Sequence, residues 1–82
     1  MNVEQRNQFG LLCHAHAQML ERASFVCNEL AAKIRGETPK QLDHADYERW
    51  MLVHAELHRL GVEISVLLDQ AAHEVDRSSR HA

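Results

Sequence analysis

The sequence predicts an all-α protein, an antiparallel two-helix hairpin that dimerises into a four-helix bundle. Two long segments repeat apolar residues at steps of three and four, the spacing of a helix face. Between them lies one break, which holds the single proline and one of the three glycines. No window alternates apolar and polar residues as a half-buried strand does. A chain of 82 residues, 45% apolar and 26% charged, has a globular composition and room for one domain, residues 1–82.

The first helix is expected over about residues 3–35. Asn2 can cap it, with Gln5 as the reciprocal partner of a capping box. Gly36 suits the left-handed position just after a helix. A seam in heptad register runs along this helix through Phe9, Leu12, His16, Met19, Ala23, Val26 and Leu30. A helical wheel extends the inward face to Phe9, Leu12, Cys13, His16, Leu20, Ala23, Cys27, Leu30, Ala31 and Ile34.

A three-residue turn, 36–38, is expected to lead into a second helix over about residues 39–77. Thr38 would be the N-cap, Pro39 the first helical residue and Gln41 the capping-box partner. Residues 78–82 read as a frayed tail. The inward face is flanked by Trp50 and consists of Leu42, Val53, Leu57, Leu60, Ile64, Leu67, Leu68, Ala71 and Val75.

So short a turn predicts that the two helices are antiparallel neighbours, and that the numbers of two facing residues add up to about 75. In that register His16 lies level with Arg59, and Cys13 lies level with Val62.

Apolar residues remain outside both inward faces. Such residues can be scattered surface positions, which every protein has. However, four of them share one side of the second helix, and a hairpin can bury only one stripe on each helix. We therefore expect another protein or a second copy to cover a surface formed by Leu11, Phe25, Trp50, Met51, Ala55, Val62 and Val66. Trp50 has two interpretations: an anchor for the partner, or a core residue near the turn opposite Phe25 or Val26.

Four side chains are weak candidates for metal ligands. His54 and His58 are one helical turn apart, the spacing at which two imidazoles can hold one metal ion. Cys13 and His16 share the inward face of the first helix. The simpler interpretation is that His54 and His58 are solvated, that Cys13 is a packed thiol, and that His16 bonds to Glu56 or Glu63. No catalytic residue, metal or cofactor is predicted.

Composition excludes several classes of protein. The net charge is −3 and the basic residues are scattered among acids, which disfavours a nucleic-acid surface. No segment has the length and apolarity of a membrane span, and the polar N-terminus lacks a secretory signal. Cys13 and Cys27 would lie about 21 Å apart on one helix, so we expect reduced thiols in the cytoplasm. Protonation of all seven histidines would shift the formal charge from −3 to +4, so association can depend on pH.

The overall plan, with the corner Arg35-Gly36-Glu37-Thr38-Pro39 near its middle, is similar to the small helical co-chaperones of type III secretion needles. It also resembles short phage-encoded helical proteins that occupy a host complex, including some anti-CRISPR proteins. These resemblances concern length and helix pattern, and imply a non-enzymatic protein-binding module: an adaptor, a co-chaperone or an inhibitor. The alternative is a metal- or pH-responsive helical bundle that uses Cys13, His16, His54 and His58.

Overall fold

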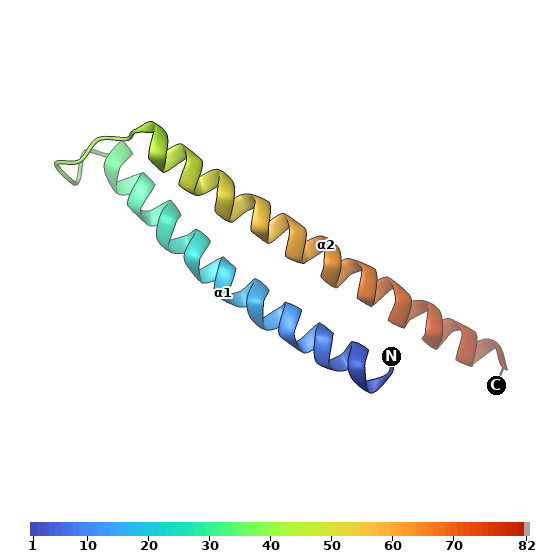
Figure 1. Ribbon diagram of the computed structural model, residues 1–82. Coiled ribbons are helices and arrows are strands. Elements are labelled where there is room, and N and C mark those ends of the chain that lie inside the picture. Colours follow the sequence, from blue (N-terminus) through green and yellow to red (C-terminus); the bar gives the residue numbers. More distant parts are fainter. Residues whose placement is uncertain (82) are drawn as a thin grey trace.

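Two long antiparallel helices make up the hairpin (Figure 1). The computed structural model describes the backbone of residues 1–81 and the side chains of residues 1–77. Helix α1 covers Val3–Ile34 and helix α2 covers His44–His81. Both termini lie at the end of the hairpin opposite the connection (Figure 1), and the molecule measures 65 × 20 × 18 Å. The predicted all-α hairpin is therefore confirmed.

Helix α1 begins and ends at the predicted signals. The Gln5 N–H donates to Asn2 Oδ1 at 2.8 Å, and the Asn2 N–H donates to Gln5 Oε1 at 3.1 Å, which completes the capping box. Gly36 has a φ of +72°. Its N–H donates to the Lys33 carbonyl while the next N–H, from Glu37, donates to the Ala32 carbonyl. This is the Schellman arrangement, in which glycine accepts the left-handed backbone without a Cβ clash.

The predicted start of the second helix was wrong, because α2 begins at His44 rather than at residue 39. The Asp46 N–H donates to Asp43 Oδ1 at 2.9 Å, and the Asp43 N–H donates to Asp46 Oδ2 at 3.2 Å. The Asp43 carboxylate thus satisfies one of the N–H groups that a helix start leaves without a partner, and the Asp46 carboxylate binds back to the N–H of the N-cap. The Thr38 hydroxyl donates instead to the Lys40 carbonyl. The connection therefore covers 35–43 and also contains the other expected helical residues, Pro39, Gln41 and Leu42.

Replacement of the true N-cap should destabilise the hairpin. We expect Asp43→Ala to lower the free energy of unfolding by about 1 kcal/mol, because the Asp46 N–H loses its acceptor. Thr38→Ala is the matched control and should change it by less than about 0.5 kcal/mol. Urea unfolding followed by circular dichroism measures both. A larger loss from Thr38→Ala than from Asp43→Ala would show that the helix starts at Thr38.

The far end of α2 also departs from the prediction. The helical backbone continues to His81, four residues beyond the expected end at residue 77. Four residues of the expected frayed tail, 78–81, thus have helical backbone, whereas their side chains and the whole of Ala82 lie outside the described residues.

The longer connection changes the register of the two helices. Near the connection, the cross-helix pairs Lys33–Asp46 and Glu29–Arg49 join residues whose numbers sum to 79 and 78, whereas the N-terminal amine and Glu74 at the open end sum to 75. In the middle of the hairpin, His16 shares a groove with Val62 while Arg59 lies outside it, so the expected pairing of His16 with Arg59 was wrong, and that of Cys13 with Val62 stays a prediction.

The core is small and follows a narrow seam. Its buried apolar residues are Ala23, Val26, Val53, Leu60 and Leu67. Met19, Leu30, Trp50 and Leu57 pack against the first three of these. The α1 seam thus has the predicted three-and-four spacing, and most residues of the wider inward faces are buried or half-buried, but six of them were assigned wrongly. These six exposed residues are Leu20, Cys27, Ile34, Leu42, Leu68 and Val75. Two helices touch along one line, so side chains well to either side of it reach solvent.

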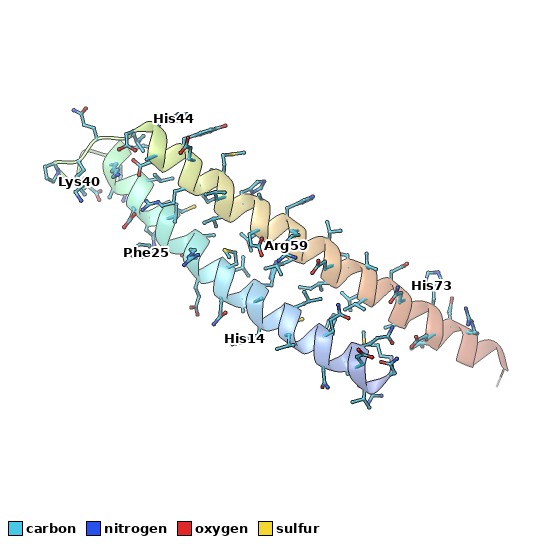
Figure 2. The ribbon with its side chains drawn as sticks, viewed as in Figure 1. His14, Phe25, Lys40, His44, Arg59 and His73 are labelled. Atoms are coloured by element: carbon cyan, nitrogen blue, oxygen red, sulfur yellow. The ribbon has the colours of Figure 1, made fainter. Side chains whose placement is uncertain are left out.

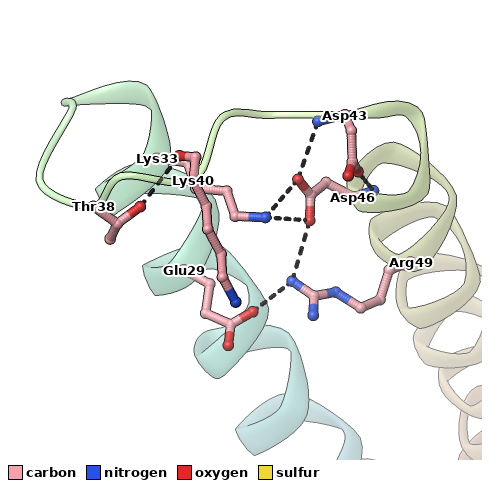
Figure 3. A network of polar contacts seen from close by, with 7 residues as sticks. All are labelled: Glu29, Lys33, Thr38, Lys40, Asp43, Asp46 and Arg49. Atoms are coloured by element: carbon pink, nitrogen blue, oxygen red, sulfur yellow. Dashed lines mark hydrogen bonds and ion pairs between the residues drawn. The ribbon is translucent and has the colours of Figure 1, made fainter.

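A cluster of charged residues ties the start of α2 to the end of α1 (Figure 3). The Asp46 carboxylate is buried and accepts two hydrogen bonds from Lys33 Nζ, at 2.8 and 2.9 Å. Arg49 lies 3.6 Å from the same carboxylate and also donates to Glu29 on α1. The hydrogen bond from Lys33 holds the pKa of Asp46 below its ordinary value of 3.8, although burial opposes this shift.

Because the pKa of Asp46 is lower in the folded chain, its carboxylate stabilises the hairpin at neutral pH. That contribution is complete above pH 3.8 and is lost as the pH falls through the lower folded-state pKa. We expect the urea midpoint of the wild type to fall across this range, and that of Asp46→Asn to fall less. Parallel slopes for the two proteins between neutral pH and pH 3 would contradict this role of Asp46.

Candidate protein-binding surface

An open groove of about 830 Å³ runs along one side of the hairpin between the two helices. Helix α1 contributes His16 and Leu20 to its lining. The lining residues of α2 recur at steps of three and four, so they form one face of that helix: His54, Leu57, His58, Gly61, Val62, Ser65, Val66, Asp69 and Gln70.

The groove is almost free of formal charge. Asp69 is the one member of its eleven-residue lining that is charged when histidine is neutral. A second hollow between the helices contains Glu21, Arg22 and Glu56. Glu56 lies two residues after His54, and therefore about 200° further around α2. The two sides of the seam thus differ in chemistry: one is apolar and rich in histidine, and the other is charged.

The charged side is organised around Arg59, midway along α2 (Figure 2). Its guanidinium donates to Glu56 at 3.1 Å and to Glu63 at 3.0 Å. The hydrogen bond from Arg59 lowers the pKa of Glu56 and keeps this carboxyl ionised. Glu56 and Glu63 were the predicted partners of His16. In the structure Arg59 binds both, because the register places His16 in the groove on the other side.

Of the predicted binding residues, two line the groove and the others lie outside its lining. Val62 and Val66 line the groove and are 48% and 51% exposed. Met51 and Ala55 are exposed on the same helix, outside the groove. Leu11 is exposed on α1, away from the groove lining.

Two aromatic residues of the predicted surface have different surroundings. Phe25, in the half of α1 nearer the connection (Figure 2), borders a separate hollow with Pro39 and Lys40. Trp50 is half-buried and packs against the core cluster that contains Val26. Its ring also stacks on that of His54, with centroids 6.1 Å apart. Trp50 therefore closes the core near the connection, and Phe25 is not its counterpart.

Three of the four metal-ligand candidates meet in the groove. His16, His54 and His58 line it together, while Cys13 is half-buried outside its lining. In the part of the chain that the structure describes, no three histidine, cysteine, aspartate or glutamate side chains are arranged to hold a metal ion. The groove histidines form a polar part of a surface with apolar neighbours.

Sequence reasoning missed Leu20, Gly61 and Ser65 as residues of one surface. Leu20 had been assigned to the hairpin core, but it lies to one side of the line along which the helices touch and is 51% exposed. The available signal was Gly61, a glycine in the middle of a long helix, where it costs about 1 kcal/mol relative to alanine. A Cβ built on Gly61 meets no atom within 4 Å, so packing within the hairpin does not require glycine there.

Because comparisons with known proteins found no match, a function can be inferred only from the geometry of the surface. No family model matches the chain, and no curated protein or solved structure matches it either. Over the described residues, neither helix combines the length and hydropathy that crossing a bilayer demands.

Proposed function

We propose that this protein is a non-enzymatic protein-binding module, of the adaptor, co-chaperone or inhibitor type, which binds through the groove side of the hairpin. The proposal rests on the difference in charge between the two sides of the seam. The centre of a protein interface is depleted in charged residues. The groove has one carboxylate among eleven lining residues, in a chain in which 26% of residues are charged.

The shape of the surface supports binding to a macromolecule rather than to a small substrate. Substrate sites are concave and enclose most of their ligand. The groove is shallow and open, and exposed Val62 and Val66 stand along it. An amphipathic helix of a partner is the kind of element that such a groove accepts. The free thiols of Cys13 and Cys27 suit a reducing cytoplasm, which is the compartment we propose.

A tagged full-length chain, expressed in its native host, tests the proposal when variants are compared. Val66→Glu places a charge in the groove, and Leu52→Glu places the same charge at an exposed position of α2 outside the groove. We expect at least one protein, a second copy included, to co-purify with the wild type and with Leu52→Glu. The amount of this protein that co-purifies with Val66→Glu should be about 10-fold lower. The same retained set for all three proteins would contradict binding through the groove.

His54 and His58, which both line the groove, favour a second candidate, a metal-responsive bundle. Two imidazoles one helical turn apart can share a metal ion. Calorimetric titration of the reduced protein with zinc distinguishes the two functions. Stoichiometric micromolar binding that is lost in His58→Ala would support metal response, and no measurable heat would exclude it.

A further inference from the structure

We propose that the occupant of the groove is a second copy of this chain, related by a two-fold axis that crosses α2 between Gly61 and Val62. This inference rests on the proposed function and names the partner of the same surface. The two copies would form a four-helix bundle, with the groove side of each hairpin facing the other.

The exposed surface of one chain is too large for a self-sufficient monomer. A folded monomer of 9.4 kDa is expected to expose about 5,000 Å². The hairpin exposes 6501 Å², because its 65 Å length is more than three times its width. The excess is about 1,500 Å² per chain, or about 3,000 Å² for two chains, which falls in the range of about 2,000–5,000 Å² that obligate dimers bury. A second copy would therefore cover the area that one hairpin leaves exposed.

The groove is complementary to itself. Its lining on α2 extends from His54 to Gln70 and is centred at Val62, within one residue of a point between Gly61 and Val62. A two-fold axis at that point places His54 of each copy against Asp69 of the other, an imidazole against the one carboxylate of the lining. Helix α2 spans 44–81, so its own centre lies within about one residue of the axis and the copies overlap along nearly all of α2.

Gly61 gains a role in this arrangement. Near the axis, Gly61 of one copy faces Val62 of the other, so the missing side chain leaves room for the valine and for a close approach of the helices. Within one hairpin a Cβ on Gly61 meets nothing, so the hairpin itself does not require this glycine. In the same arrangement, the apolar side chain of Leu57 in one copy lies opposite that of Val66 in the other.

Sedimentation equilibrium of the full chain tests the inference. We expect twice the chain mass of 9.4 kDa at micromolar concentration. Val62→Glu brings two carboxylates together near the axis and should weaken association about 100-fold, while circular dichroism shows an intact helix content. Leu52→Glu, which adds the same charge to the same helix at a position 73% exposed, should leave the mass unchanged. Equal masses for Val62→Glu and Leu52→Glu would overturn the inference.

Disulfide formation between copies tests the position of the axis. In a background with Cys13→Ala and Cys27→Ala, Val62→Cys should form an intermolecular disulfide under mild oxidation, whereas Leu52→Cys should not. Gly61→Ala should weaken association about 10-fold, and Gly10→Ala, at an equally open helical glycine on α1, should not.

A wild-type chain that stays monomeric while the groove still retains another protein in the host would overturn this inference and leave the proposed function in place. A monomer that retains nothing would overturn both.

Discussion

Leu60→Ala should lower the free energy of unfolding by about 3 kcal/mol, the largest effect of any single truncation we expect in this chain. Leu60 is 3% exposed and is one of five buried apolar residues among the side chains that the structure describes. Removal of three methylene-sized groups loses their transfer free energy and leaves a cavity that two rigid helices cannot close. In so small a core, such a loss is a large share of the total stability.

Urea unfolding followed by circular dichroism measures this loss. The matched control is Leu52→Ala, which makes the same chemical change on the same helix at a side chain that is 73% exposed. It should change the free energy of unfolding by less than about 0.5 kcal/mol. Similar losses from the two variants would show that α1 and α2 do not pack along the seam that contains Leu60.

Trp50→Ala is expected to have the second largest effect, a loss of about 2 kcal/mol in the free energy of unfolding. The indole packs against the core cluster of Ala23, Val26 and Val53, and it is half-buried rather than enclosed. We therefore place its contribution below the range for a fully buried tryptophan. Circular dichroism is the suitable probe, because the variant lacks the only tryptophan of the chain.

Tyr47→Ala serves as the control for this substitution. Tyr47 lies one turn earlier on α2 and is 59% exposed, so its truncation should leave stability nearly unchanged. A partner anchor would behave differently from a core residue: Trp50→Ala would then reduce binding while the urea midpoint stayed at the wild-type value. That pattern would contradict the packing of Trp50 against the core.

The parts of the fold that depend on local chemistry were predictable from sequence. The capping box at Asn2 and the left-handed Gly36 need only residues within one or two turns, and both are present in the structure. The start of α2 was not predictable in the same way. Thr38 and Asp43 are both good N-caps, and the ion pair from Lys33 on α1 to Asp46 favours the second of them. A contact between helices thus decided a choice between two local signals.

The candidate surface was predictable only in part, for a related reason. Val62 and Val66 were correctly separated from the core by their position on the helix, and both are exposed. The meeting of Leu20 and His16 with them depends on the register, which next to the longer connection differs from the expected one by about three residues. Periodicity along a helix gives the direction of a side chain, but it does not give the residue on the neighbouring helix that lies beside it.

Solution X-ray scattering of the wild-type chain tests most directly whether a second copy covers the groove. A single hairpin has the dimensions 65 × 20 × 18 Å. We expect scattering from a particle of twice the 9.4 kDa chain mass that is still about 65 Å long and is wider in cross-section, because the copies lie side by side along α2. A particle with the mass and cross-section of one hairpin at every concentration measured would contradict the dimer.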